Sequence, residues 1–336
     1  MKIAHCSDVH LGFGRFGGAR SARRKEDVIN CFLAAVDTII DRGCRVALFP
    51  GDFFDSPDPD NETLLAAITG ITRLTREGIS VRIISGQHDT PKSERCHIFA
   101  ALQATDSTGR LQMMHAGEFT EDIDGFRFVY QGWDNIPLDW AALPEGDFLV
   151  VHAPYPPAIF SDRHPRAIYE GIPDNWSYLA LGDWHERKEI MPGAWYSGGL
   201  ERLNFGEQGS DCGILVIDTD TGEVTPWDSP ARELITIDFD LDTWDRPEEK
   251  LREVLEGFES AAIRLRMAGD PTRIDPKCLD FHPLIQREFL GRPDVAAQVN
   301  LGTAEVATSW EEFCNRQKLS PQVFRYGRHF LREIGR

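Results

Sequence analysis

The sequence predicts an α/β protein in which two packed β-sheets are flanked by helices. Three observations lead to this fold class. Apolar runs and amphipathic helical patterns alternate through the first part of the chain, shorter β-like runs follow, and polar residues come directly after five of the apolar runs. An α/β first half that continues into a strand-rich second half is typical of a two-sheet sandwich with helices on the outside.

Each expected element rests on its own pattern. The segment 26–42 places Val28, Phe32 and Val36 on one helical face and is followed by Gly43, a common helix stop. The segment 62–77 is likewise followed by Gly78, and Asp218 to Gly222 reads as a turn between two strands. The expected helices are 26–42, 62–77 and 94–104, and the expected strands are 2–5, 45–49, 79–84, 111–114, 126–131, 148–151, 178–181, 195–197 and 213–217.

A domain boundary is expected near Pro230, where a Ser-Pro step follows the last of these strands. Beyond it, a strand at 234–239, a helix at 247–258 and a strand at 261–267 form a small α/β unit. The remaining residues read as a helical tail interrupted by prolines. The predicted domains are therefore 1–228, the α/β sandwich, 229–271, a small α/β unit, and 272–336, a helical C-terminal region.

The composition is that of an ordinary globular protein of 336 residues, with 41% hydrophobic and 27% charged residues. No apolar run reaches the roughly 18 residues that a membrane span needs, and the first residues are too polar for a signal peptide. The seven cysteines show no Cys-x-x-Cys spacing and are expected to be buried free thiols. We therefore expect a cytoplasmic protein without a membrane partner.

The net charge of −18 argues against broad, non-specific affinity for polyanions. Basic residues nevertheless gather after the first polar motif, where Arg15, Arg20, Arg23, Arg24 and Lys25 follow one another closely. Such a cluster is either a phosphate-contacting surface or an ordinary solvated face.

Five polar motifs follow apolar runs. Taken alone, each has a plain structural explanation as a turn, a helix cap or a core histidine; together they are typical of a dinuclear metal hydrolase, which gathers six or seven ligands from separate loops. The motifs are Asp8-x-His10, Gly51-Asp52-x-x-Asp55, Gly86-Gln87-His88-Asp89, His152 and Gly182-Asp183-x-His185.

The residue types predict the chemistry. Residues two apart in an extended segment share a face, so Asp8 and His10 would point to the same side. Asp52 is the best candidate for a carboxylate that bridges two cations and helps them to activate a water for attack on phosphorus. Oxygen-rich ligation with three imidazoles suits Mn²⁺, Fe or Zn²⁺ better than Ca²⁺.

This series resembles the calcineurin-like metallophosphoesterase superfamily over about residues 1–205. The resemblance implies one metal held by Asp8, His10, Asp52 and His185, and a second held by Asp52, Gln87, His152 and Asp183. It also implies that His88 lies beside the substrate as the catalytic group, with Asp89 orienting its imidazole.

Two positions depart from the family pattern. Gln87 stands where the family has Asn, and Asp183 stands where it has His. The harder carboxylate at 183 should favour Mn²⁺ or Mg²⁺ over Zn²⁺ in the second metal position.

Further segments resemble the SbcD-type DNA repair nucleases: the opening eleven residues, the basic entry to the first long helix and the run from Tyr196 to Glu207. The resemblance implies an endo- or 3′-exonuclease that uses two divalent ions, most readily Mn²⁺, on single-stranded, frayed or bubble DNA. It also implies that 1–228 is the catalytic domain and 229–271 a capping domain. Expected partners are DNA, an SbcC-type coiled-coil ATPase docked on the C-terminal helices, and a second copy of the chain. The candidate substrate-binding residues are Arg15, Arg23, Arg24, Asp55 and Arg202.

Two other functions remain open at this point. One is a phosphodiesterase or phosphatase acting on nucleotides or other small phosphoesters. The other is a non-catalytic adaptor with a degenerate metal site, which the altered residue at 183 would explain.

Overall fold

The computed structural model describes residues 1–15, 19–92, 97–133, 142–154, 175–279, 282 and 284–290. The chain divides into two compact units. The first comprises Met1–Ile237, Leu255–Arg264 and Leu279–Gln286, and the second comprises Asp238–Val254, Leu265–Cys278 and the residues from Arg287 on.

The first sheet of unit 1 has six strands in the order β12-β11-β1-β2-β3-β4. Strands β1 to β4 run parallel, whereas β11 and β12 add to the β1 edge in antiparallel fashion. The strands are β1 (Lys2–His5), β2 (Val46–Pro50), β3 (Ser80–Ile84), β4 (Leu111–Met114), β11 (Gly213–Asp218) and β12 (Val224–Asp228).

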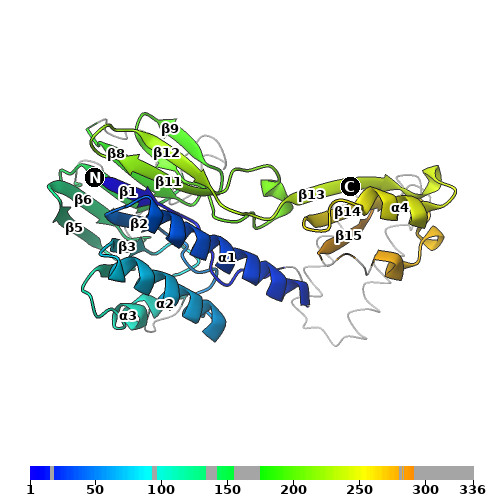
Figure 1. Cartoon of the computed structure of the whole chain (residues 1–336), viewed down its shortest axis with the longest axis horizontal. Coiled ribbons are helices and arrows are strands. Elements are labelled where there is room, and N and C mark those ends of the chain that lie inside the picture. Colours follow the sequence, from blue (N-terminus) through cyan, green and yellow to red (C-terminus); the bar gives the residue numbers. More distant parts are fainter. Residues whose placement is uncertain are drawn as a thin grey trace, which may run out of the picture. The chain divides into compact units, whose positions relative to one another are not determined.

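The second sheet also has six strands, in the order β5-β6-β7-β8-β10-β9. Its four inner strands are parallel, and an antiparallel strand closes each edge. The strands are β5 (Glu118–Ile123), β6 (Phe126–Gln131), β7 (Phe148–His152), β8 (Tyr178–Gly182), β9 (Lys188–Met191) and β10 (Ala194–Tyr196). Figure 1 shows the two sheets, which confirm the predicted sandwich.

Alternation along the strands builds the core. Ile3 and Leu48 of the first sheet face the second and pack with Phe128 and Val150. Their neighbours point the other way, toward the helices: Ala4, Ala47 and Phe49 lie in a separate cluster with helix residues such as Phe32. Both faces of the central strands are therefore buried, as expected for a parallel arrangement.

Three helices cover the outer face of the first sheet: α1 (Ala19–Asp41), α2 (Asn61–Arg76) and α3 (Ile98–Gln103). Asp60 caps α2 by accepting from the Thr63 backbone N–H. Helix α1 begins at Ala19, seven residues before the predicted start at 26. The prediction missed this first part because the basic run 20–25 has no apolar pattern, although it is helical. Within that run the core-facing position is taken by a charged residue, Arg24, which is 0% exposed.

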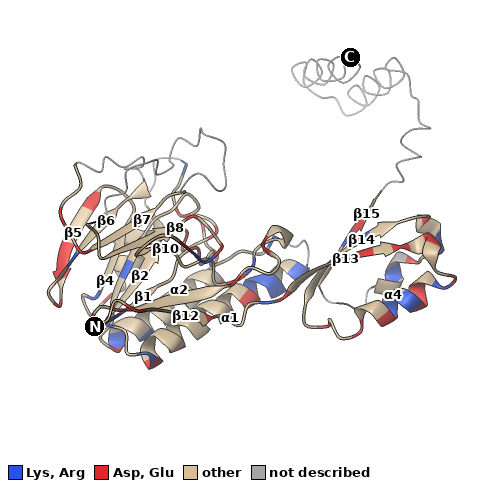
Figure 2. Ribbon diagram, turned by 90° about the horizontal axis from the view of Figure 1, so that it is seen from above, with Lys and Arg blue, Asp and Glu red and all other residues tan. Residues whose placement is uncertain are grey.

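Strands β13 (Leu234–Asp240), β14 (Ala262–Ala268) and β15 (Ile285–Phe289) form a three-stranded sheet in that order. Helix α4 (Pro247–Leu255) follows β13, and Figure 2 shows acidic and basic residues interspersed on it. The prediction that residues 272–336 are helical is wrong for β15, whose Ile285 is buried as a strand residue; residues 291–336 lie outside the described part.

Five cysteines are free and buried, as predicted: Cys6, Cys31, Cys44, Cys212 and Cys278. Cys96 and Cys314 lie outside the described residues. Among the helices that the structure describes, none combines the length and the apolar character that crossing a membrane would require.

Candidate metal centre

All five polar motifs lie at the carboxyl ends of β1, β2, β3, β7 and β8 or in the loops that follow, and His152 is the last residue of β7. These strands are parallel within their sheets, so their carboxyl ends lie at the same edge of the sandwich. Backbone hydrogen bonds tie the first two loops together, since the N–H groups of Asp8 and His10 donate to the carbonyls of Gly51 and Asp52. Five segments far apart in the sequence thus converge.

The backbone of these loops is strained at the ligand positions. Among described non-glycine residues, positive φ angles occur at Asp8 (51°), His10 (49°), Asp52 (48°), Asp124 (50°) and Asp183 (102°). Four of the five are predicted metal ligands. Such conformations cost of the order of 1–3 kcal/mol each and concentrate at functional sites.

Two glycines allow the loops to approach closely. A Cβ on Gly86 would lie 2.2 Å from the Asp52 Oδ1 atom, and a Cβ on Gly51, which has φ +87°, would lie 2.1 Å from His152 Nδ1. Any larger residue would therefore displace a candidate ligand.

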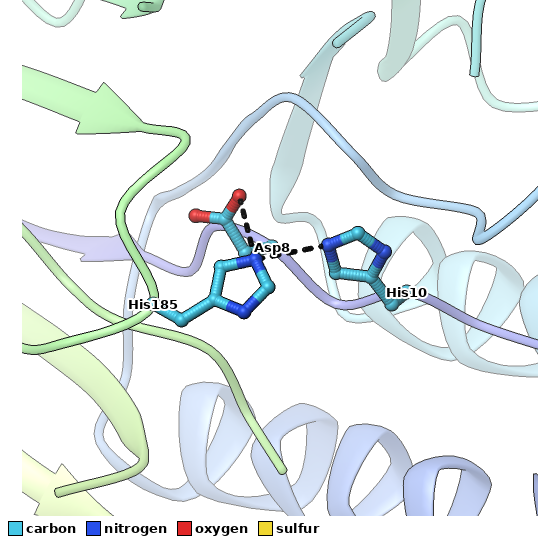
Figure 3. Close-up of side chains that lie close together, drawn as sticks. All are labelled: Asp8, His10 and His185. Atoms are coloured by element: carbon cyan, nitrogen blue, oxygen red, sulfur yellow. Dashed lines mark hydrogen bonds and ion pairs between the residues drawn. The ribbon is translucent and has the colours of Figure 1, made fainter. Parts of the chain in front are cut away.

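The first group of ligand atoms is contributed by Asp8, His10 and His185 (Figure 3). The Nε2 atoms of the two histidines lie 3.2 Å apart, and His185 Nε2 lies 3.9 Å from Asp8 Oδ1. Asp8 and His10 are 1% and 2% exposed. The three side chains face one another from the β1 and β8 loops, as the close-up shows.

The second group surrounds His152, which is fully buried. Its Nε2 atom lies 3.5 Å from Asp52 Oδ2, 3.7 Å from Asp183 Oδ1 and 2.8 Å from Gln87 Oε1. Gln87 also donates from Nε2 to Asp183 Oδ1 at 2.9 Å. Both residues that depart from the family pattern are therefore part of the cluster.

Asp52 lies between the two groups. Its Oδ2 atom is 3.8 Å from His10 Nε2 and 3.5 Å from His152 Nε2, and it is buried without a hydrogen-bond partner among the described residues. Asp8 also contributes an atom to both groups. A buried, unpartnered carboxylate oxygen between imidazole nitrogens fits a site for divalent cations.

The pKa values of the clustered side chains are shifted by burial and by neighbouring charges of opposite sign. Burial alone would raise the pKa of Asp52, but the nearby His152 and His10 outweigh it and hold the pKa well below the usual range. Burial would lower the pKa of His152, yet Asp52, Asp8 and Asp183 raise it to about 10. Burial also raises the pKa of Asp183. Without a cation, protons compensate the buried carboxylates.

Comparison with known proteins agrees with this geometry. Residues 1–190 match the family model described as calcineurin-like phosphoesterase. The chain belongs to the calcineurin-like phosphoesterase family.

Curated relatives of this phosphoesterase domain carry the name DNA double-strand break repair protein Mre11. The protein of Methanosarcina mazei is 26% identical over 82% of this chain and 46% of its own length. The protein of Methanococcus maripaludis is 32% identical over 56% of this chain and 52% of its own length. The protein of Sulfurisphaera tokodaii is 35% identical over 58% of this chain and 43% of its own length. The chain spans about half the length of the curated relatives it matches.

Within the phosphoesterase site, Asp89 has different partners from the predicted one. Its carboxylate accepts from the backbone N–H groups of Phe53, Phe54 and Gly86 at 2.7–3.1 Å, which ties the β2 and β3 loops together. The Nδ1 atom of His88 lies instead 3.2 Å from the carbonyl oxygen of Asp55. The prediction that Asp89 orients His88 is therefore wrong: the loop geometry gives that position to Asp55.

Asp55 itself lies among three basic groups. One of its carboxylate oxygens lies 3.4 Å from His10 Nδ1 and 3.8 Å from His88 Nδ1, and the other lies 3.4 Å from Arg15 Nη2. These contacts make it a support for the two histidines. A direct contact of Asp55 with substrate stays a prediction.

The four arginines predicted to bind substrate lie in different environments. Arg15 is 66% exposed and Arg23 is exposed on α1, so both remain candidates. Arg24 is buried and donates to Asp27 and to the Arg202 carbonyl, so the prediction that it contacts DNA is wrong. Arg202 donates to the carbonyls of Ser210 and Arg232, which makes it a loop-organising residue.

Sequence reasoning assigned no role to Glu207. Its Oε1 atom lies 3.1 Å from His185 Nδ1, next to the first group of ligands. Glu207 is the last residue of the segment from Tyr196 that resembles SbcD-type nucleases. Its place in that motif was the one sequence feature that could have indicated a role at the site.

Proposed function

We propose that this chain is a Mn²⁺-dependent DNA nuclease of DNA repair that hydrolyses phosphodiester bonds at a dinuclear metal centre, with endo- or 3′-exonucleolytic cleavage. The observation that carries the proposal is the convergence of five loops on one cluster of carboxylate, imidazole and amide groups. The names of the curated relatives support DNA as the substrate class.

The ligands divide into two sets that share Asp52. Asp8, His10 and His185 with Asp52 would hold one ion, and Gln87, His152 and Asp183 with Asp52 would hold the other. Two such ions, when bound, supply an activated water nucleophile and neutralise the charge that develops on the phosphoryl oxygens. Oxygen atoms predominate in the second set, which favours Mn²⁺ over Zn²⁺ there.

His88 is placed to act on the substrate. It is part-buried, and its ring centroid lies 4.7 Å from that of His10. A carbonyl oxygen can only accept, so the Asp55 carbonyl fixes the proton of His88 on Nδ1. In the imidazolium form, the Nε2–H group is left to stabilise the phosphorane or to protonate the leaving oxygen.

Two exposed basic residues complete the proposal for DNA. Arg15 and Arg23 follow the β1 loop and would contact phosphate near the cluster. With a net charge of −18, the chain would rely on such local contacts and on the metal ions instead of on a broad positive surface. A coiled-coil ATPase and a second copy of the chain remain proposed partners; the C-terminal residues invoked for the ATPase lie outside the described part.

The test compares three substrates with Mn²⁺, Mg²⁺ or Zn²⁺ added: single-stranded DNA, bubble DNA and a generic aryl phosphodiester. Cleavage of DNA with Mn²⁺ supports the nuclease. Turnover of the aryl diester without cleavage of either DNA would identify a small-molecule phosphodiesterase instead. No turnover of any substrate with any metal would overturn the hydrolase and favour the adaptor.

A further inference from the structure

All three ligand histidines present Nε2 to the metal cluster, and in two of them Nδ1 makes a hydrogen bond to a different acceptor. His152 Nδ1 lies 2.9 Å from the Pro50 carbonyl oxygen. His10 Nδ1 lies 3.4 Å from an Asp55 carboxylate oxygen and makes no hydrogen bond among the described residues. His185 Nδ1 lies 3.1 Å from Glu207 Oε1, the shorter of the two imidazole–carboxylate distances.

Glu207 is itself held firmly. It lies in a 3₁₀ turn, Phe205–Glu207, that Asn204 caps. Its Oε2 atom accepts from the Leu203 backbone N–H at 2.7 Å, and its Oε1 atom accepts from Asn204 Nδ2 at 2.5 Å. A carboxylate with these donors has a defined position before any metal binds, so it can impose an orientation on the ring of His185.

We propose that Glu207 is a positioning residue of the metal centre: it accepts the Nδ1–H of His185 and so keeps the Nε2 lone pair of that imidazole directed at the first metal position. An ionised carboxylate can only accept, which selects the Nδ1–H tautomer. The same bond raises the basicity of the ligating nitrogen. The inference rests on the proposed metal centre, and it predicts that the two metal positions respond differently when Glu207 is changed.

The experiment measures Mn²⁺ binding to the full chain by isothermal titration and counts bound Mn²⁺ by electron paramagnetic resonance. For Glu207→Gln we expect a 10- to 100-fold weaker affinity at one of two positions, with the other unchanged, because a glutamine has one acceptor oxygen for three donors. In the protein loaded with diamagnetic Zn²⁺, the ¹H shift of His185 Nδ1–H should move upfield in Glu207→Gln, because a neutral amide oxygen accepts a weaker hydrogen bond than a carboxylate.

Two control variants separate positioning from other effects. Glu186→Gln removes the same charge from an exposed residue directly after His185 and should leave both affinities unchanged. Asn204→Ala loosens the turn but keeps the carboxylate and its bond from the Leu203 N–H, so it should lower the melting temperature and preserve the hydrogen-bonded His185 Nδ1–H shift.

Three results would overturn the proposal: equal Mn²⁺ affinity in the wild type and Glu207→Gln, equal weakening in Glu186→Gln, or an unchanged His185 Nδ1–H shift in Glu207→Gln. A wild-type chain that binds no divalent metal would instead refute the metal centre itself. The two failures are therefore distinguishable.

Discussion

His5 makes the stability of this protein depend on pH in a way that can be calculated. The side chain is 0% exposed and lies between the sheets, where Nε2 donates to the Leu181 carbonyl and Nδ1 accepts from the Tyr178 hydroxyl. Burial lowers the pKa of His5 from 6.5 to about 3, although the bond to Leu181 opposes the shift. The folded protein therefore keeps this ring neutral at pH 5.

Between pH 6.5 and 3 the unfolded chain binds a proton at His5 that the folded protein does not bind. The contribution of His5 to the free energy of unfolding is therefore fully present above pH 6.5 and decreases as the pH falls. The decrease ends near pH 3, where the folded protein also binds the proton. Going from pH 7 to pH 5, linkage gives a loss of about 1.9 kcal/mol in the free energy of unfolding from this one group.

The assay is urea unfolding at pH 7 and pH 5, in chelator, of the wild type and His5→Gln. The glutamine has an acceptor and a donor but does not titrate, so the loss between the two pH values should be smaller in the variant by about 2 kcal/mol. Tyr178→Phe is the control: it removes the hydroxyl, weakens the protein at both pH values and retains the pH-dependent loss. Equal losses in the wild type and His5→Gln would refute the reasoning.

The remaining predictions concern the site and its supports. Arg24→Met should destabilise the protein by about 3–5 kcal/mol, measured by urea unfolding, because it leaves the buried Glu201 without its ion pair and Asp27 with Arg232 alone; a change below about 1 kcal/mol would contradict this. His88→Ala should abolish DNA cleavage while two equivalents of Mn²⁺ still bind, and loss of metal would instead make it a ligand. Asp183→His should shift the metal preference toward Zn²⁺ with an unchanged fold, judged by competition binding and circular dichroism, and an unaltered preference would remove this residue from the ligand set. Replacing both Arg15 and Arg23 by Gln should weaken DNA binding and reduce the slope of log K against log salt concentration by about 2, whereas an unchanged slope would exclude phosphate contacts.

Much of the site could be predicted because its ligands follow strands. The run from Lys2 to His5 alternates between the two core faces, and the break in the apolar pattern after it marks the loop that carries Asp8 and His10. The loop of Asp52 follows β2 by the same rule. Parallel strands bring such loops to one edge of the sandwich, so a local pattern was sufficient to group residues that are far apart in the sequence.

The sequence could not show which charged groups pair. Arg24 lies in a basic run that resembles a DNA-binding surface, yet the tertiary structure buries it next to Asp27 and Glu201. Asp89 follows His88 directly, yet its carboxylate binds the backbone of another loop. Asp27 is only three residues from Arg24, but the contact that accompanies its burial, with Glu201, comes from a distant segment, as do the Phe53 and Phe54 N–H groups that bind Asp89.

The sequence by itself determined the sandwich, the edge that holds the site and the identity of the metal-ligand candidates, since apolar periodicity and polar residues after strands are local properties. Only the tertiary structure decided that Asp55 and Glu207 stand behind His10 and His185, that Arg24 is internal, and that β15 is a strand. Each of these outcomes depends on contacts between distant segments. Burial and distance in the folded chain decide which polar groups pair, whereas in the sequence several partners are equally plausible.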